Sequence, residues 1–303
     1  MENSFLRSVA RVYVANGALD SVFVLPNRRS LKFFQMYLGQ EYGAVTGKPL
    51  FSPQILTVSD FFAGLSGITT ADSVEQLYIL YKEYIKLKYK LEGFEKGSLK
   101  EPFDEFVHWG DTLLKDFNDV DKYMVDARQL FTNIRDLKEL DGDFSFLSPR
   151  QFEAVKCFWT NYLRGGKFSG KKEFFTSMWE IMYQLYINFN RSLQEKGVGY
   201  EGMIYRKAAE SVEGADFPRR VVFIGLNAPN KCERRVMQYL RECGKGDFYW
   251  DFYGPMLTDR RNSASEIIRE CVKEFPSLYG IDGGTLPVGE QKVKVYASPS
   301  GVG

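Results

Sequence analysis

The stretch 219–253 constrains the fold more than any other part of this chain. Its residues 221–224, Val-Val-Phe-Ile, form a continuous apolar run of the kind found in buried central strands. A segment with apolar residues at helical spacing follows, and Phe-Tyr-Trp at 248–250 begins a second strand after two glycines. This order predicts a β-α-β unit and therefore an α/β fold. The loop after residue 224 would lie at the carboxyl end of a strand, where such sheets bind ligands.

That loop carries no acidic residue. It begins Gly225-Leu226-Asn227, whereas an ATPase would place carboxylates for magnesium at this point. Either Asn227 or Asn230 can cap the following helix, because an asparagine side chain accepts hydrogen bonds from the free N–H groups of a first turn. The sequence thus predicts a loop in the ligand-binding position without the residues that would hold a metal ion.

Composition and charge limit the classes of protein. A length of 303 residues allows about two domains, and 44% hydrophobic with 26% charged residues is typical of a globular chain. The formal net charge is +1, so any contact with nucleic acid must come from a local basic patch. The four cysteines are far apart, as expected for free thiols in a reducing compartment. Without a signal peptide or an apolar run of about 18 residues, we expect a cytoplasmic protein that does not enter membranes.

A second candidate site follows the first strong strand, residues 21–25. The loop and helix after it begin with Asn27, Arg28 and Arg29, and Lys32 adds a third positive charge one turn later. A helix N-terminus favours anions, so two arginines there suggest a corner that binds phosphate, and we name these four residues as DNA-binding candidates. The alternative is that these charges are simply solvated on an exposed turn.

The pattern of strands and helices suggests three segments. Residues 1–100 contain two predicted strands and form the first part of the α/β core. Between 101 and 200 strand signals nearly vanish, and we expect an all-helical insertion. Residues 201–303 give the second part of the core, which ends in a loop after a strand-like run at 292–297, so we expect the natural sequence to continue beyond Gly303. The predicted helices of the insertion and the one that follows it span 103–117, 149–163, 174–185 and 200–211.

Several stretches resemble catalytic or metal-binding motifs but lack the spacing or the residues that those motifs require. Residues 43–49, Gly-Ala-Val-Thr-Gly-Lys-Pro, lack one residue between the glycines of a phosphate-binding loop and have proline in place of its Ser/Thr. The acidic run 116–121 has neither the glycine nor the final glutamate of a calcium loop, and we expect turns between two helices there. His108 is the only histidine, which leaves no histidine-based triad or multi-histidine metal site. Asp247 and Asp251 have no accompanying lysine. The sequence therefore offers no catalytic or metal-binding set.

Four segments in a recognisable order carry a resemblance to a known family. They are residues 23–29 (FVLPNRR), 54–62 (QILTVSDFF), 75–81 (EQLYILY) and 109–123 (WGDTLLKDFNDVDKY), and the last is the most specific. Together they resemble the N-terminal part of AddB-like proteins of Bacteroides-type bacteria, which are helicase/nuclease subunits of double-strand-break repair. The similarity spans most of the chain.

The resemblance implies a degenerate P-loop NTPase-like core of the superfamily 1 helicase type, interrupted by a helical subdomain. Residues Ile224, Gly225, Leu226 and Asn227 would then be the Walker B region, without its acid. The Walker A strand and loop have no counterpart in residues 1–20. The family's PD-(D/E)XK exonuclease, which needs Mg²⁺, would lie beyond Gly303, and an AddA-like helicase/nuclease subunit would be the partner.

From the sequence we therefore expect an inactivated, helicase-like scaffold that guides DNA non-specifically and contains no cofactor or catalytic residue of its own. One alternative is an active ATP-dependent translocase whose nucleotide site is unrecognised or supplied by a partner. Another is a protein–protein docking module that makes no contact with DNA. Binding to DNA through lysine and arginine should weaken steeply with salt, which separates the first hypothesis from the last.

Overall fold

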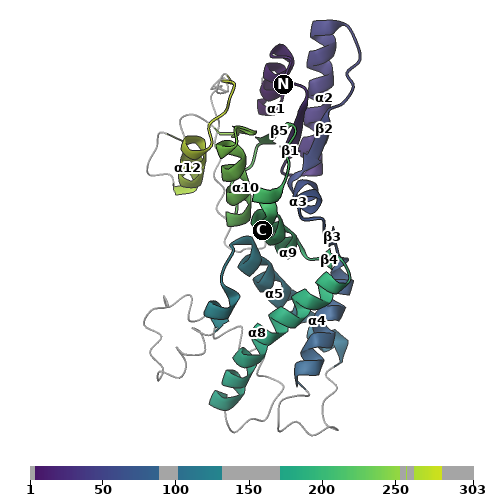
Figure 1. Cartoon of the computed structure of the whole chain (residues 1–303), viewed down its shortest axis with the longest axis vertical. Helices are drawn as coiled ribbons and strands as arrows, with labels where there is room; N and C mark the ends of the chain where they lie inside the picture. The colour runs from purple at the N-terminus through teal and green to yellow at the C-terminus, as the bar shows by residue number, and fades with distance from the viewer. Residues whose placement is uncertain (1–3, 89–101, 132–170, 253–256, 258–262, 282–303) are drawn as a thin grey trace, which may run out of the picture. The chain divides into compact units, whose positions relative to one another are not determined.

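The computed structural model describes residues 4–88, 102–131, 171–252, 257 and 263–281. The chain divides into two compact units. The sheet unit comprises residues 1–58, 216–228 and 240–303, and the helical unit comprises residues 59–215 and 229–239. Both units are built from segments that are far apart in the sequence (Figure 1).

The sheet unit contains a four-stranded parallel sheet with the order β2-β1-β5-β6. Its strands are β1 (Ser21–Leu25), β2 (Gln54–Thr57), β5 (Arg220–Ile224) and β6 (Gly246–Tyr249). The two central strands pair in register, with Val24 opposite Phe223. Both are almost wholly buried, as their continuous apolar runs predict. The predicted α/β fold with a parallel sheet is confirmed.

Two helices cover one face of this sheet, α1 (Phe5–Ala15) and α2 (Arg28–Thr46). Because successive strand residues point to opposite faces, Phe23 and Leu25 of β1 meet the helices together with Val222 and Ile224 of β5. The two helices are also joined by charge, since the Glu41 carboxylate accepts hydrogen bonds from Arg7 at 2.5 Å and Arg11 at 3.2 Å. On the other face, Phe248 packs between Phe223 and Phe275, which follows α12 (Glu266–Glu274).

Asp247, one of the two acids that flank the second strand of the β-α-β unit, is a buried structural residue. Its side chain accepts a hydrogen bond from the Tyr13 hydroxyl and from the backbone N–H groups of Phe248 (2.9 Å) and Leu278 (2.6 Å). The residue is 1% exposed. The carboxylate therefore connects α1 and the segment around residue 278 to the amino end of β6.

The helical unit has a core of its own, rich in aromatic rings. Its helices are α3 (Val58–Ser66), α4 (Ser73–Lys88), α5 (Phe103–Lys122), α8 (Lys171–Glu195), α9 (Glu201–Ser211) and most of α10 (Lys231–Glu242). Strands β3 (Thr69–Thr70) and β4 (Val198–Gly199) form a two-stranded parallel ladder. The 3-10 helix η2 (Val212–Gly214) follows α9, and a second, η3 (Ser263–Ser265), belongs to the sheet unit. The largest buried rings belong to Phe106, Phe117, Phe189, Tyr84, Tyr186 and Tyr200.

Helices α5 and α9 approach closely at Gly202. A Cβ atom built on this glycine would lie 2.5 Å from the backbone oxygen of Asn118. The Gly202 N–H donates to Asn118 Oδ1 at 2.6 Å, so the contact is a hydrogen bond as well as a close packing of two backbones. Only glycine fits this position without a backbone shift.

Several sequence predictions need correction. The boundary at residue 100 places α4 in the core, whereas the structure divides the chain at Val58 and Asp216, because α4 packs on α5 and α8. Residues 116–121 do not form turns between helices but the last turns of α5. Helix α2 runs to Thr46, so the stretch 43–47 that resembles a phosphate-binding loop is the C-terminus of this helix, closed by Gly47. The predicted helix 149–163 and strand 292–297 lie outside the described residues.

Candidate nucleic-acid interface

The order of the sheet reverses between β1 and β5. The chain leaves β1 through α2 to reach β2 on one side, and it leaves β5 through α10 to reach β6 on the other. Open α/β sheets bind ligands outside the carboxyl ends of the strands at such a switch point. Because β1 and β5 are paired neighbours, the structure brings the loop at Asn27 and the loop at Gly225 to the same edge of the sheet. Both groups of predicted site residues therefore meet at this edge.

On the β1 side, one of the four candidates has a structural role. Asn27 has an extended backbone, and its Oδ1 accepts a hydrogen bond from Ser30 N at 2.9 Å, so it caps α2. Arg28, Arg29 and Lys32 are exposed, and no described residue forms an ion pair with them. The first turn of α2 contains no acid. Three cations that no described residue neutralises therefore form, at this helix N-terminus, a favourable place for an external anion.

On the β5 side, the geometry explains why no acid is present. Ile224 is 0% exposed and points into the core beneath α1, where a carboxylate would be buried without a partner. Gly225 has φ +74, a conformation that favours glycine, and its N–H donates to the Tyr249 carbonyl at 2.8 Å. Leu226 is also buried. Of these four candidates, Asn227 alone has an exposed side chain.

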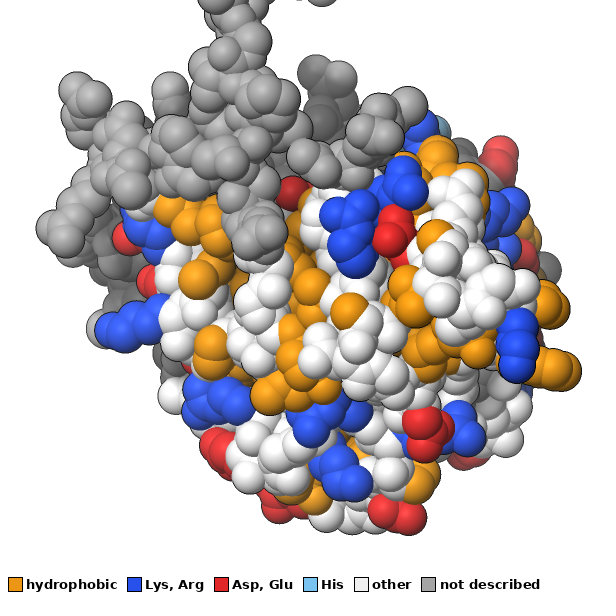
Figure 2. Space-filling model, turned by 90° about the horizontal axis from the view of Figure 1, so that it is seen from above, with side chains coloured by type: hydrophobic (Ala, Val, Ile, Leu, Met, Phe, Trp, Pro, Cys, Tyr) orange, Lys and Arg blue, Asp and Glu red, His pale blue; other side chains and the backbone are white. Residues whose placement is uncertain are grey.

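The end of the molecule that carries α1 and α2 in Figure 1 is seen from above in Figure 2. Lys and Arg side chains are spread over the described part of this face, with Asp, Glu and hydrophobic side chains between them. They do not form one continuous basic stripe on it. This distribution agrees with the net charge of +1 and limits any contact with a polyanion to local groups.

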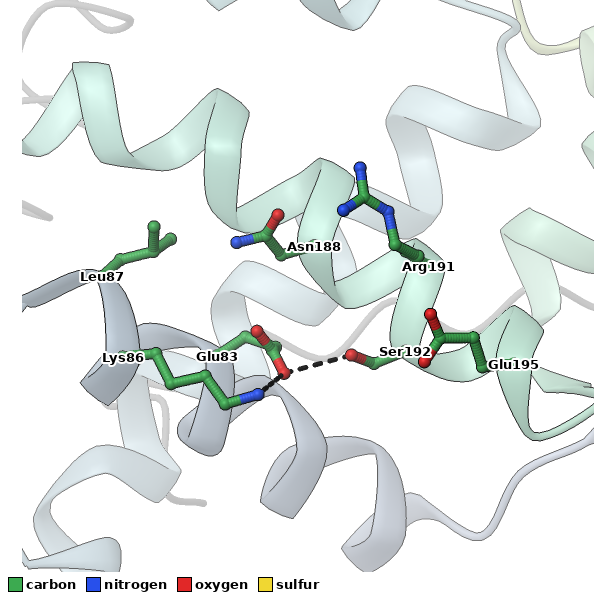
Figure 3. Close-up of a pocket in the computed structure, with 7 residues that line it drawn as sticks. All are labelled: Glu83, Lys86, Leu87, Asn188, Arg191, Ser192 and Glu195. Carbon is green, nitrogen blue, oxygen red and sulfur yellow. Dashed lines mark hydrogen bonds and ion pairs between the residues drawn. The ribbon is translucent and has the colours of Figure 1, made fainter.

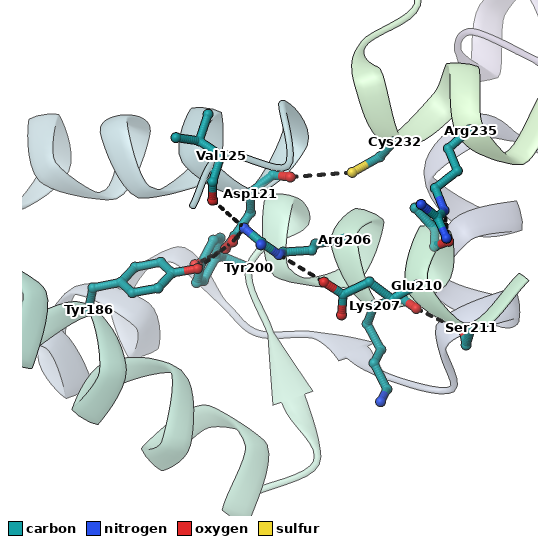
Figure 4. Close-up of polar contacts among 11 residues, drawn as sticks. Asp121, Val125, Tyr186, Tyr200, Arg206, Lys207, Glu210, Ser211, Cys232 and Arg235 are labelled. Atoms are coloured by element: carbon teal, nitrogen blue, oxygen red, sulfur yellow. Dashed lines mark hydrogen bonds and ion pairs between the residues drawn. The ribbon is translucent and has the colours of Figure 1, made fainter. Parts of the chain in front are cut away.

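The helical unit contains a buried polar network that sequence analysis missed (Figure 4). Asp121, 1% exposed, accepts hydrogen bonds from the hydroxyls of Tyr186 and Tyr200 and from Arg206 Nη1 at 3.3 Å. Arg206 Nη1 also donates to the carbonyl of Val125 at 2.9 Å. Burial raises the pKa of Asp121 above its ordinary value, although the two tyrosines and the arginine oppose this effect. The four groups satisfy one another, so the network stabilises the unit.

Cys232 adjoins this network and is not a reactive thiol. Its Sγ donates to the backbone oxygen of Asp121 at 3.3 Å, and burial raises the pKa of the thiol to about 12. A nucleophilic cysteine requires a lowered pKa and access to solvent. Cys232 therefore acts as a small buried side chain that packs α10 against the end of α5.

Two open pockets lie in the helical unit. The larger, about 450 Å³, lies between α4 and α8 (Figure 3). Its most buried acid, Glu83, accepts hydrogen bonds from Lys86 at 2.6 Å and Ser192 at 3.0 Å. The smaller pocket, about 310 Å³, borders the Asp121 network. Both pockets are lined by charged as well as apolar side chains, and the lining of the smaller one also includes Tyr183 and Tyr186.

Among the described residues, no group of three or more His, Cys, Asp or Glu side chains is arranged to hold a metal ion. No helix in the described part of the chain is long and apolar enough to cross a membrane. No protein-family model matches the chain, and no curated protein matches it.

Proposed function

We propose that the sheet unit binds the phosphate backbone of DNA, without sequence preference, at the carboxyl edge of β1 and β5. The proposal rests on one observation above all: Arg28, Arg29 and Lys32 are exposed at the switch point, and no described residue neutralises them. Phosphate contacts from lysine and arginine supply most of the affinity of non-specific DNA binding. The protein would act as a scaffold that guides DNA rather than as a catalyst at this site.

The outer surface of α2 supports contact with a nucleic-acid strand. Arg29, Lys32, Phe33 and Met36 follow one another at helical spacing, and all four are exposed. Phe33 is 42% exposed and lies 6.4 Å from the ring of Tyr37 in a stacked arrangement. A row of cations beside an exposed aromatic ring suits a strand whose phosphates meet the cations and whose bases stack on the ring.

The finer form of the proposal is that the sheet is a degenerate P-loop NTPase-like core of the superfamily 1 helicase type. The buried Ile224 and the glycine turn at Gly225 support it, because they fill the place where a metal-holding acid would stand. The described residues before β1, 4–20, contain α1 and no strand that could carry a phosphate-binding loop. We further propose that the nuclease, its Mg²⁺ and an AddA-like partner subunit act downstream of the DNA held here.

The experiment compares two double variants with equal changes in charge. Arg28→Ala with Arg29→Ala removes two cations from the carboxyl edge. Lys48→Ala with Arg219→Ala removes two exposed cations from the amino ends of β2 and β5. Affinity for a labelled single strand and for a labelled duplex is measured by fluorescence anisotropy at several salt concentrations. We expect the first variant to bind more weakly and its log-log salt slope to fall by about 2, or about 1 per lost phosphate contact.

The control variant should keep the affinity and slope of the wild type. Equal affinity and slope in all three proteins would reject the site, and absence of binding even at low salt would favour a docking module. An active translocase would instead bind ATP, which would raise the Tm in the presence of magnesium by mass action. An unchanged Tm with millimolar ATP and magnesium argues against that alternative.

A further inference from the structure

The smaller pocket of the helical unit has the make-up of a site for a flat ligand. It has a volume of about 310 Å³ and is open on one side. Tyr183 and Tyr186 of α8 contribute rings to its wall, and Ala127, Ile187 and Met124 contribute apolar surface. Two arginines, Arg128 and Arg206, and Asp126 are charged residues of its described lining. A ligand here would therefore meet both an aromatic ring and charged groups.

The base of this pocket is fixed by the buried carboxylate of Asp121. Tyr186 and Arg206 both line the pocket, and both donate hydrogen bonds to this one side chain. The Nε of Arg206 is also held by Glu210 at 3.0 Å. The tyrosine ring and the guanidinium are therefore held in place before any ligand arrives, which lowers the entropy cost of binding.

The wall also contains a strained residue. Met124 has φ +52, and it is the one residue other than glycine with positive φ in the described part of the chain. It follows the end of α5, where its N–H donates to the Asp121 carbonyl at 2.9 Å and the Val125 N–H donates to the Val120 carbonyl at 2.9 Å. Glycine is the usual residue at this position of a helix end. A methionine at this position has a strained backbone, and it supplies a flexible apolar side chain to the wall of the pocket.

Among the described residues that line the pocket, Arg128 is the cation without an ion-pair partner. Arg206 is paired with Asp121 and Glu210, and the Asp126 Oδ1 accepts a hydrogen bond from Gln129 N at 3.0 Å. Arg128 is exposed, and no described residue forms an ion pair with it. An anionic group of a ligand would therefore meet Arg128 at the rim, while the flat part of the ligand lies against Tyr183.

We propose that this pocket binds a single nucleotide, with the base against Tyr183 and the phosphate at Arg128. Bases that are not stacked in a helix are recognised by aromatic side chains and by guanidinium planes, and both are present here. The nucleotide is either free or one unit of a single strand. The choice of a nucleotide over other flat anions rests on the proposed function, but the pocket shares no residue with the carboxyl edge of the sheet.

The test uses the whole chain and three probes, AMP, adenosine and inorganic phosphate, with binding followed by calorimetry. Tyr183→Leu removes one ring and keeps an apolar side chain. Tyr78→Leu makes the same change at a half-exposed ring on α4. Arg128→Gln removes the positive charge at the rim. We expect AMP to bind the wild type more tightly than adenosine, and phosphate alone to bind too weakly to detect.

Tyr183→Leu should weaken AMP and adenosine alike, by about 5- to 100-fold, because it removes stacking. Arg128→Gln should lower the affinity for AMP to that for adenosine and leave adenosine unchanged. Tyr78→Leu should change neither. Failure of AMP to bind the folded wild type at millimolar concentration would overturn the proposal, and so would equal effects of Tyr183→Leu and Tyr78→Leu.

A short oligoadenylate strand identifies the source of the nucleotide. Competition between the strand and AMP, lost in Tyr183→Leu, supports a nucleotide within a strand, whereas binding of AMP without competition supports a free nucleotide. The Arg28→Ala/Arg29→Ala variant separates this proposal from the proposed function, because it should bind AMP as the wild type does. The experiments can therefore reject nucleotide binding in the pocket while DNA binding at the sheet is upheld. They can equally reject DNA binding at the sheet while nucleotide binding is upheld.

Discussion

The two units differ in where their charged side chains lie: exposed at the edge of the sheet, and buried and paired inside the helical unit. At the carboxyl edge of the sheet, Arg28, Arg29 and Lys32 face solvent, and no described residue neutralises them. Inside the helical unit, Asp121 and Arg206 are paired, and two tyrosine hydroxyls complete the hydrogen bonds of the carboxylate. Exposed cations contribute little to stability and are available to a partner, whereas a buried pair is expensive to break. The first arrangement should therefore matter for binding and the second for folding.

The largest effect should come from breaking the buried network. Asp121→Ala leaves the guanidinium of Arg206 and the hydroxyls of Tyr186 and Tyr200 without their shared acceptor. We expect the free energy of unfolding to fall by about 3–5 kcal/mol, as for other buried pairs that lose one member. Asp111→Ala is the matched control, since Asp111 is 54% exposed and, of the residues the structure describes, pairs only with Lys115 on the surface of α5. It should cost less than about 1 kcal/mol in urea unfolding. Similar midpoints for the two variants would show that the network is not a stabilising element.

A smaller effect is expected at the crossing of α5 and α9. Gly202→Ala places a Cβ atom 2.5 Å from the backbone oxygen of Asn118, and a backbone atom cannot turn away as a side chain can. Overpacking of this kind costs about 1–3 kcal/mol. Gly214→Ala is the control, because a Cβ there meets no atom within 4 Å. If thermal unfolding gives both variants the same Tm, the two helices tolerate a wider separation than the structure shows.

The sequence predicted the sheet better than it predicted the helical unit. The apolar runs at β1 and β5 and the loops after them follow from strand chemistry alone, so the residues at the carboxyl edge could be named in advance. The roles of Asn27 as a cap and of Ile224 as a core residue needed the packing of the unit. Asp121 gave no usable signal, because its partners come from positions 186, 200 and 206, and its place among other acids suggested a turn.

The pH dependence of stability should differ in sign between the units. Burial raises the pKa of Asp121 above 3.8, so the folded state binds the proton of this carboxyl more tightly than the unfolded state does. The stability that this proton binding contributes falls as pH rises from about 4 towards the raised pKa. Burial also acts to raise the pKa of Glu41, but hydrogen bonds from Arg7 and Arg11 lower it below 4.5 overall. Its contribution is present above about pH 4.5 and is lost as pH falls through the lowered pKa.

Each contribution is isolated by comparing the wild type with a neutral variant, Asp121→Asn or Glu41→Gln, in urea unfolding between pH 3 and pH 7. A group whose pKa is shifted by one unit changes the difference in stability by about 1.4 kcal/mol across its window. The difference between the wild type and Asp121→Asn should shrink as pH rises, and the difference for Glu41→Gln should grow. If both differences in unfolding free energy change in the same direction with pH, the expected contrast between the units is wrong.

The smallest effect concerns the strained residue that links the network to the pocket. Met124→Gly relieves a left-handed backbone that costs about 1–2 kcal/mol for other residues, but it adds about 0.5–1 kcal/mol of chain entropy to the unfolded state. The net gain in stability should therefore be below about 1 kcal/mol. Met124→Ala loses the same side chain and keeps the strain, so the glycine variant should be the more stable of the two. If the Met124→Ala and Met124→Gly variants are equally stable, the backbone at residue 124 is not strained. The methionine would then give no support to a ligand site.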